Sequence, residues 1–380
     1  MFSVRSAVSI AAVACVAATG LAAPSALAAS SAANPSPAAK LASVERHAPN
    51  PASRPGADKS ASKSSAAEAV ELDRIAGSNR YLTPVEISKR HFPDGVWAED
   101  GSPVEVVTVA SGTNYPDALA GGPFAAGLGP LLLVPAAGTI PAGVTAEINR
   151  LSPDVIVILG GTGAVNAGVE TQLNALADTV RLSGTNRYDT AATIAEATDG
   201  DLVDGADTVV LSSGEGFADS LSGGASAAVQ SGVLMLTRPL GLPTETRDAL
   251  VAIAPSNVQV LGGPLVVSDV VLDQVKAALP GATVTRVFGA SRADTAAEVS
   301  KTTFPSGTSE EFLTNGWNYP DALAAAPLAW YWDASVLLTR PGCAPAGTIA
   351  EDTRLAPDFR TAIGGTLAVS DAALNLTPCP

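Results

Sequence analysis

The sequence predicts an α/β protein made of three tandem Rossmann-like parallel-sheet sandwiches, packed as a pseudo-threefold triplet after a signal peptide and a disordered linker. First, the motif Arg-x-x-Gly-x-x-Arg-x-x-Thr occurs three times, starting at Arg74, Arg181 and Arg286. Second, strand-like and helix-like segments alternate between these motifs, as in folds with parallel sheets. Third, the interval of roughly a hundred residues is far longer than a solenoid repeat, and each copy can bury its own core.

The N-terminus, residues 1–29, has the pattern of a secretory signal. Arg5 precedes an apolar run, and small residues favour cleavage after Ala28 or Ala29. The run is shorter than the ~20 residues that a membrane span requires, and no other segment is apolar enough to be transmembrane. Residues 30–71 are rich in Ala, Ser and Pro with almost no large apolar side chain, which predicts a disordered linker. The protein is therefore expected to be secreted.

Three repeats are expected to divide the rest of the chain: 72–178, 179–283 and 284–380. A strand over 179–183 lies between the first two copies and fits the sheet of either one, so the sequence leaves its partner open. The third copy ends too soon after Ser370 to form both a full last helix and a further strand.

The second repeat shows the succession of elements most clearly. Strands are predicted where apolar residues are continuous rather than alternating, which is typical of parallel strands covered by helices on both faces. Helices are predicted where a glycine-containing turn or a capping residue precedes a longer amphipathic or small-residue segment. In chain order the elements are a strand at 179–183, a helix at 191–197, a strand at 208–212, a helix at 218–230, a strand at 233–237, a helix at 244–252, a strand at 258–261 and a helix at 269–279.

The helix after each arginine motif is expected to begin at the threonine of that motif. Thr190 is predicted to be the N-cap in the second copy. In the other copies Thr83 with Glu86, and Thr295 with Glu298, have the spacing of a capping box, in which the two side chains satisfy orphan amides.

A second motif, Ser-Gly-Thr-Asn-Tyr-Pro-Asp in the first copy, follows the next strand. In one interpretation Asn114 caps the helix and Asp117 interacts favourably with the helix dipole. In the other, the turn lies at the carboxyl edge of the sheet, where parallel folds bind ligands. The neighbouring aromatic residue then either lines a sugar site or packs in the core. The candidate ligand-binding residues of this motif are Asn114, Asn318, Asp117, Asp219 and Asp321.

The second arginine of the first motif is the strongest candidate for binding an anion. It stands at a strand-to-helix turn, before a helix N-terminus that itself attracts anions. A guanidinium group adds a planar fork of donors for phosphate or carboxylate. A salt bridge to the aspartate of the second motif is the competing interpretation. Another arginine recurs in copies two and three, and the arginine candidates are Arg80, Arg187, Arg292, Arg238 and Arg340.

The composition excludes several function classes. The net charge of −15 argues against nucleic acid as a partner, because phosphate binding needs a broad basic face. No cofactor and no metal are expected, since zinc-type spacing is absent and the nearest approach to a dinucleotide motif, Gly160–Gly163, does not recur. Neither histidine recurs between the copies, and no nucleophile motif is present, so an enzyme is not expected. In an exported chain, Cys343 and Cys379 are expected to form a disulfide.

Taken together, the arginine motif, the Asn-Tyr-Pro-Asp-Ala-Leu segment and the Leu-Gly-Gly turn resemble the cell-wall-binding repeat type 2 family over residues 72–380. The resemblance implies one Rossmann-like domain per repeat and non-covalent attachment to an anionic wall polysaccharide or teichoic-acid-like polymer at the cell surface. Copy two departs from the family pattern at Gly216 and Ala218, and copy three at Ala293, which puts equal affinity of the three sites in question.

Two other functions remain open from the sequence. One is a wall-glycan hydrolase or a modifier of a wall amidase, and the other is a surface-layer scaffold. The chain itself is expected to be a monomeric pseudo-trimer, because its three copies lie in one polypeptide.

Overall fold

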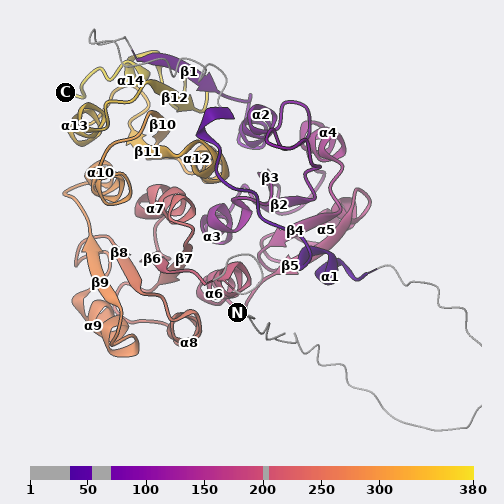
Figure 1. Ribbon diagram of the computed structural model, residues 1–380, viewed down its shortest axis with the longest axis horizontal. Helices are drawn as coiled ribbons and strands as arrows, with labels where there is room; N and C mark the ends of the chain where they lie inside the picture. Colours follow the sequence, from indigo (N-terminus) through magenta and orange to yellow (C-terminus); the bar gives the residue numbers. More distant parts are fainter. Residues whose placement is uncertain (1–34, 54–69, 200–204) are drawn as a thin grey trace, which may run out of the picture. The chain divides into compact units, whose positions relative to one another are not determined.

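Three four-stranded parallel sheets organise the computed structural model, which describes residues 35–53, 70–199 and 205–380 (Figure 1). Sheet I has the strand order β3-β2-β4-β5, sheet II β7-β6-β8-β9 and sheet III β11-β10-β12-β1. The strands are β1 (Glu71–Ile75), β2 (Val106–Ser111), β3 (Leu131–Val134), β4 (Val155–Leu159), β5 (Asp178–Leu182), β6 (Thr208–Ser213), β7 (Val233–Thr237), β8 (Asn257–Leu261), β9 (Thr283–Val287), β10 (Glu310–Asn315), β11 (Ala334–Thr339) and β12 (Phe359–Ile363). The predicted signal at 1–29 lies outside the described residues.

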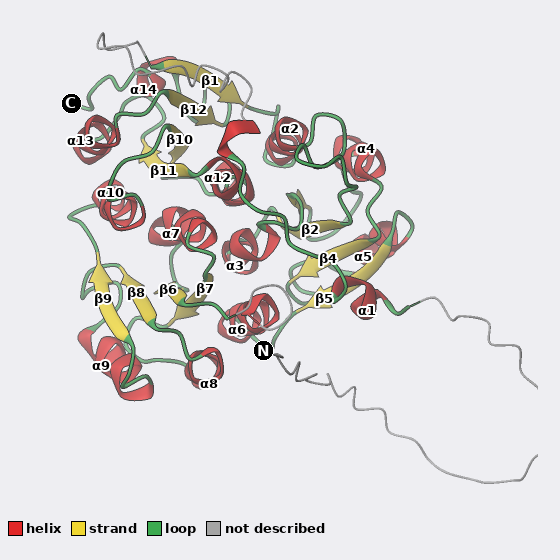
Figure 2. Ribbon diagram, in the orientation of Figure 1, coloured by secondary structure: helices red, strands yellow, loops and turns green. Residues whose placement is uncertain are grey.

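Helices connect successive strands, both within a sheet and from one sheet to the next (Figure 2). They are α1 (Pro37–Leu41), α2 (Leu82–His91), α3 (Pro116–Ala125), α4 (Ala142–Leu151), α5 (Ala167–Asn174), α6 (Arg187–Ala197), α7 (Ala218–Val229), α8 (Thr244–Ile253), α9 (Asp269–Ala278), α10 (Arg292–Thr303), α11 (Pro320–Leu323), α12 (Ala326–Trp332), α13 (Ala346–Leu355) and α14 (Asp371–Leu374), with a 3₁₀ turn at Pro51–Ser53. None of the helices in the described ranges has the length and apolar character needed to cross a membrane.

The predicted succession of parallel strands and helices is confirmed. Every residue of the inner strands β2, β4 and β6 is buried, as their continuous apolar sequences require. The edge strand β5 is only half-buried, whereas the edge strands β3 and β7 at the other side of their sheets are fully buried.

The structure resolves which sheet the open strand completes. β5 pairs with β4, with Val180 opposite Val157, so it completes the sheet of the preceding copy. β9 completes sheet II in the same way. Sheet III takes its last strand from the other end of the fold, since β1 pairs with β12 and places Ile75 opposite Ile363. The strand that the third copy lacks is therefore supplied by the start of the first.

The pseudo-threefold packing is also confirmed. Helices α3, α7 and α12 lie together in the middle of the three sheets (Figure 1). Their approach is close enough that a Cβ added to Gly122 would lie 2.6 Å from the Cβ of Ala326. At one end of this bundle the rings of Tyr115, Phe217 and Tyr319 meet edge to face, with centroids 5.4–5.5 Å apart. These repeat-equivalent aromatics stabilise the interface between the copies.

The prediction of a disordered linker is wrong for Ser36–Ser53. The Arg46 guanidinium donates to the carbonyl oxygens of Pro123 and Phe124 near the end of α3, and the His47 ring stacks on Trp97 at 4.0 Å. Composition missed this because contacts of a few single residues hold the segment, including the buried side chain of Leu41, rather than a run of apolar side chains. The rest of the predicted linker up to residue 69 lies outside the described residues.

The predicted N-cap role of Thr190 is also wrong. Helix α6 begins at Arg187, four residues before the predicted start, and Asn186 caps it by accepting hydrogen bonds from two backbone amides. Thr190 instead accepts a hydrogen bond from the N–H of Gly184 at 3.1 Å. Thr83 and Thr295 accept the equivalent bonds in the other copies. The threonine therefore ties the loop before the helix to the first turn of the helix. The spacing of residues in the sequence does not distinguish this role from capping.

Candidate functional site

The carboxyl edges of the three sheets carry the recurring polar residues. In sheet II, β6 is followed by α7 and then β7 on one side, whereas β8 is followed by α9 and then β9 on the other. The carboxyl ends of β6 and β8 therefore mark the point where connections diverge, which is where open parallel sheets bind ligands. The turn after β6 leads to Asp219, and β8 ends at Gly262 and Gly263.

A pocket of about 330 Å³ lies at this edge of sheet II. Its lining includes Asp219, Gly263, Gly289, Arg292 and Thr295. A pocket of about 460 Å³ lies at the equivalent place in sheet III, and its lining includes Gly77, Arg80, Thr83, Asn318, Asp321 and Gly365. The structure thus brings together the aspartate of one copy and the arginine and threonine of the next. In sheet I the corresponding residues are Asp117, Arg187 and Thr190.

Each aspartate faces an arginine without forming an ion pair with it. Burial raises the pKa of Asp117, and the charge of Arg187 opposes that rise. Asp219 with Arg292, and Asp321 with Arg80, show the same two effects, with a threonine hydroxyl also lowering the aspartate pKa. No pair among these six residues, all of them described, is close enough for a salt bridge. The competing interpretation of a direct salt bridge is therefore wrong.

The first glycine of each Gly-Gly pair makes room for this aspartate. Gly160, Gly262 and Gly364 have φ values of 97°, 101° and 118°, which an L side chain rarely adopts. A Cβ at Gly160 would lie 2.2 Å from the Asp117 Oδ2, and the other two positions are similarly crowded. The glycines thus let the carboxyl group lie directly over the end of the central strand.

Three of the five candidate arginines, Arg80, Arg187 and Arg292, lie at the junctions between sheets. Arg80 Nη1 donates to the carbonyl oxygen of Gly112 at 3.0 Å, and Arg292 Nη1 donates to that of Gly316 at 2.6 Å. Arg187 donates to Gly214 in the same manner. One nitrogen of each guanidinium is therefore anchored to the next sheet, whereas the group keeps further N–H donors for a ligand.

The first arginine of each motif has a different role, which sequence analysis did not assign. Arg286 donates to the carbonyl oxygens of Gly262 and Val267 and pairs with Asp269 at 2.9 Å. Arg74 and Arg181 make the equivalent contacts. These arginines hold the turn that forms one wall of each site. The two arginines recur with the same regularity, so recurrence alone does not separate a structural from a binding role.

The candidate arginines differ from the structural ones in whether they form an ion pair with a carboxylate. Eight arginines of the described ranges pair with a carboxylate within 4.0 Å: Arg74, Arg90, Arg150, Arg181, Arg247, Arg286, Arg354 and Arg360. Within the same ranges the five candidate arginines have no such partner. Arg238 lies 5.2 Å from the Tyr188 ring centroid, and Arg340 lies 4.6 Å from that of Trp317. A protein of net charge −15 thus keeps five arginines free of carboxylates at repeat-equivalent positions.

The asparagines of the second motif do not cap their helices. α3 begins at Pro116, and no side chain caps its first turn, so the predicted capping by Asn114 is wrong. Asn114 and Asn318 are both exposed, and Asn318 lines the pocket of sheet III.

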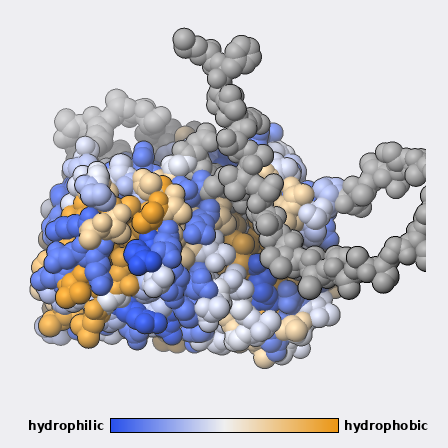
Figure 3. All heavy atoms as spheres, turned by 90° about the horizontal axis from the view of Figure 1, so that it is seen from below, coloured by the Kyte–Doolittle hydropathy of each residue, from blue (hydrophilic) through white to orange (hydrophobic). Residues whose placement is uncertain are grey.

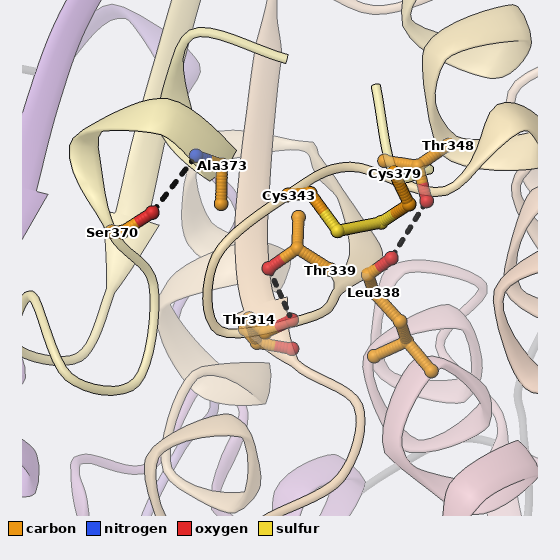
Figure 4. Close-up of a disulfide and its surroundings, with 8 residues drawn as sticks. All are labelled: Thr314, Leu338, Thr339, Cys343, Thr348, Ser370, Ala373 and Cys379. Carbon is orange, nitrogen blue, oxygen red and sulfur yellow. Dashed lines mark hydrogen bonds between the residues drawn. A yellow bond between two sulfur atoms is a disulfide. The ribbon is translucent and has the colours of Figure 1, made fainter. Parts of the chain in front are cut away.

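The predicted disulfide between Cys343 and Cys379 is present (Figure 4). It joins the C-terminal tail to the turn that follows β11. In this turn the N–H of Arg340 donates to the carbonyl oxygen of Cys343 at 3.0 Å. The bridge therefore restrains the loop that carries one of the candidate arginines.

We expect anion binding at these sites to strengthen as the pH falls from 7 toward 4.5. The pKa values of Asp117, Asp219 and Asp321 are raised by burial, so these carboxyl groups take up protons before ordinary surface carboxylates and stop repelling an anion beside the arginines. Dextran sulfate keeps its charge over this range. Its affinity, measured by titration calorimetry, is expected to rise by about threefold or more.

The matched variant replaces the three aspartates by asparagine. The asparagine variant is expected to bind more tightly at pH 7 and to show a clearly smaller pH dependence. An unchanged pH profile in this variant would contradict the assigned role of the carboxyl groups.

Comparison with known proteins places the three copies in one family. The model of the family described as cell wall binding domain 2 (CWB2) matches residues 74–170, 181–272 and 286–374. Among curated proteins, the chain is 28% identical over 269 residues to the N-acetylmuramoyl-L-alanine amidase LytC of Bacillus subtilis (strain 168), covering 70% of this chain and 50% of that protein. It is also 28% identical over 306 residues to the amidase enhancer of the same organism, covering 80% of this chain and 39% of that protein.

Solved structures share the same fold. Cwp6 from Clostridium difficile has a TM-score of 0.73 at 24% identity, covering 83% of this chain and 49% of that chain. Cwp8 from Clostridium difficile has a TM-score of 0.69 at 27% identity, covering 79% of this chain and 50% of that chain. The chain spans about half the length or less of these relatives.

Proposed function

Because the chain belongs to the cell wall binding domain 2 family, we propose that it attaches non-covalently to the bacterial cell wall by binding an anionic secondary wall polymer or glycan. The proposed location is the cell surface, after secretion. The single observation that carries the anionic specificity is the set of five arginines without a carboxylate partner, within the described residues of an acidic protein.

The proposed binding residues lie at the carboxyl edges of the sheets. At each site an arginine supplies donors for an acidic group, and the half-buried aspartate offers an acceptor for hydroxyl groups of a sugar. One arginine-anion contact at a surface is weak. Three sites on one chain bind one long polymer together, and each engaged site raises the effective concentration at the others.

Attachment is favoured over glycan hydrolysis by the acidic residues of the pockets. A glycosidase needs two carboxyl groups within about 10 Å of each other, flanking the scissile bond. The pocket of sheet II is lined by one acidic residue, Asp219, and that of sheet III by one, Asp321. The pockets therefore do not support glycan hydrolysis. Because the chain covers 50% of the amidase and 39% of the amidase enhancer, the role of neither protein is proposed for it.

The test is co-sedimentation of the protein with purified walls that are rich in anionic secondary polymers. Binding is expected to fall steadily between 50 mM and 500 mM NaCl, because salt screens arginine-anion contacts. Walls from which the secondary polymer has been extracted are the matched control and are expected to retain little protein. Equal retention on extracted walls would reject the anionic polymer as the ligand.

A further inference from the structure

Trp317 occupies an unusual place at the carboxyl edge of sheet III. It follows β10, in the turn that leads to α11, and 39% of its surface is exposed. Tryptophan is highly buried on average, and it is enriched among the residues that dominate binding surfaces. The equivalent residues of the other copies are Thr113 and Glu215, so this ring is specific to the third copy.

Two guanidinium groups lie next to the Trp317 ring. Arg292, at the N-terminus of α10, lies 4.8 Å from the ring centroid, and Arg340, after β11, lies 4.6 Å from it. Arg292 is anchored to the carbonyl oxygen of Gly316, and the turn after Arg340 is tied down by the disulfide at Cys343. The ring thus brings together two cations that have no carboxylate partner in the described part of the chain. Their mutual repulsion favours an anion beside them.

We propose that Trp317, Arg292 and Arg340 form a subsite for a pyranose residue that carries a carboxylate. The indole ring offers an apolar surface to the C–H groups of a sugar ring, and each guanidinium offers a planar fork to the carboxylate. Arg292 also lines the pocket of sheet II with Asp219, so one polymer can contact the pocket and the subsite together. This inference rests on the proposed attachment to an acidic glycan and identifies the kind of sugar that the third copy binds.

The corresponding places in the other copies are less suited to an anion. In copy two the Glu215 carboxylate accepts a hydrogen bond from the Tyr188 hydroxyl at 2.8 Å and lines a pocket with Arg238, so an acidic group stands where the third copy has Trp317 and repels an anionic ligand. In copy one the matching residues are Thr113 and Pro135, which provide neither an aromatic ring nor a second guanidinium. The third copy therefore carries the subsite.

The test compares two polymers on the full chain by titration calorimetry. Polygalacturonate presents carboxylated pyranose rings, and inorganic polyphosphate presents charge without a sugar ring. Trp317→Ala is expected to weaken binding of polygalacturonate by about five- to tenfold, because the sugar ring loses its stacking surface while both arginines remain. Trp317→Phe keeps a ring and is expected to weaken it by less than about threefold. Binding of polyphosphate to either variant is expected to change by less than about twofold.

Two controls separate a subsite from a general loss of charge or fold. Thr113→Ala alters the equivalent residue of the first copy, and Arg247→Ala removes an exposed arginine that pairs with Asp248. Both variants are expected to bind polygalacturonate as the unaltered chain does. Glu215→Gln removes the internal anion of copy two and is expected to tighten binding of both polymers. Circular dichroism checks that each variant is folded.

The proposal is overturned if the unaltered chain fails to bind polygalacturonate, or if Trp317→Ala leaves that affinity unchanged. An equal loss for polyphosphate and polygalacturonate also overturns it, because the ring then acts only on the arginines. Wall co-sedimentation distinguishes these results from failure of the proposed function. If the chain sediments with walls and Trp317→Ala leaves polygalacturonate binding unchanged, the proposed function stands and the subsite is rejected. If the chain binds polygalacturonate but does not sediment with walls, the proposed function is rejected and the subsite stands.

Discussion

Simultaneous replacement of Arg80, Arg187 and Arg292 by alanine is expected to abolish retention on cell walls and to leave the protein folded. Each guanidinium makes one hydrogen bond to a glycine carbonyl, so each loss costs about 1 kcal/mol of stability. Binding loses one arginine from each of three linked sites. The apparent affinity is therefore expected to fall by about a hundredfold or more, measured by co-sedimentation over a range of protein concentrations.

The matched control is the triple alanine variant of Arg74, Arg181 and Arg286. These arginines have the same chemistry and the same spacing, but they hold turns and pair with carboxylates. Their removal is expected to lower the midpoint of urea unfolding strongly, because six buried or half-buried carbonyl contacts are lost. If the first triple variant still sediments with walls at undiminished affinity, then Arg80, Arg187 and Arg292 are not responsible for attachment.

Removal of β1 is expected to destabilise the fold by more than about 5 kcal/mol. β1 is an edge strand of sheet III, so a chain that begins at Gly77 leaves β12 paired only with β10, as a new edge strand. It also loses the buried side chain of Ile75 and the contacts of Arg74 with the turn after β12. Urea unfolding is expected to show a separate early transition, and the amides of β12 are expected to exchange rapidly.

A chain that begins at Val70 is the matched control, because it also lacks Ser36–Ser53 but keeps β1. It is expected to unfold in one transition at a distinctly higher midpoint than the shorter chain. Equal midpoints for the two truncated chains would mean that the pairing of β1 with β12 contributes little to stability.

Most secondary structure was predictable because it depends on local patterns. Continuous apolar runs identified the buried inner strands, and the strand at 233–237 has the bounds that the sequence predicts. The starts of the helices after the arginine motifs were not predictable in this way. Thr190 has the spacing of a cap, but a glycine amide six residues earlier, brought close by the turn, takes its oxygen instead.

The sequence predicted which residues belong to the candidate site, but not which of them lie together in the fold. Recurrence pointed to Asp219 and Arg292, which belong to different copies and meet at one sheet edge. Recurrence equally marked Arg286, whose role is structural. The packing of residues 36–53 onto α3 was not predicted. Arg46 donates to backbone carbonyl oxygens, and every residue type has such a group, so the sequence does not identify the partner.

The sequence by itself determined that three copies of one α/β domain lie in tandem, which residues recur, and which segments form strands buried on both faces. These properties follow from hydrophobic burial and from backbone preferences of neighbouring residues, so short segments of the sequence determine them. The tertiary structure alone decided that each sheet takes its last strand from the motif of the next copy, that β1 completes sheet III, and which arginines lack a carboxylate. Those outcomes depend on contacts between residues up to about three hundred positions apart, as between Arg74 and Asp371, and chain spacing does not encode which distant group fills a given place.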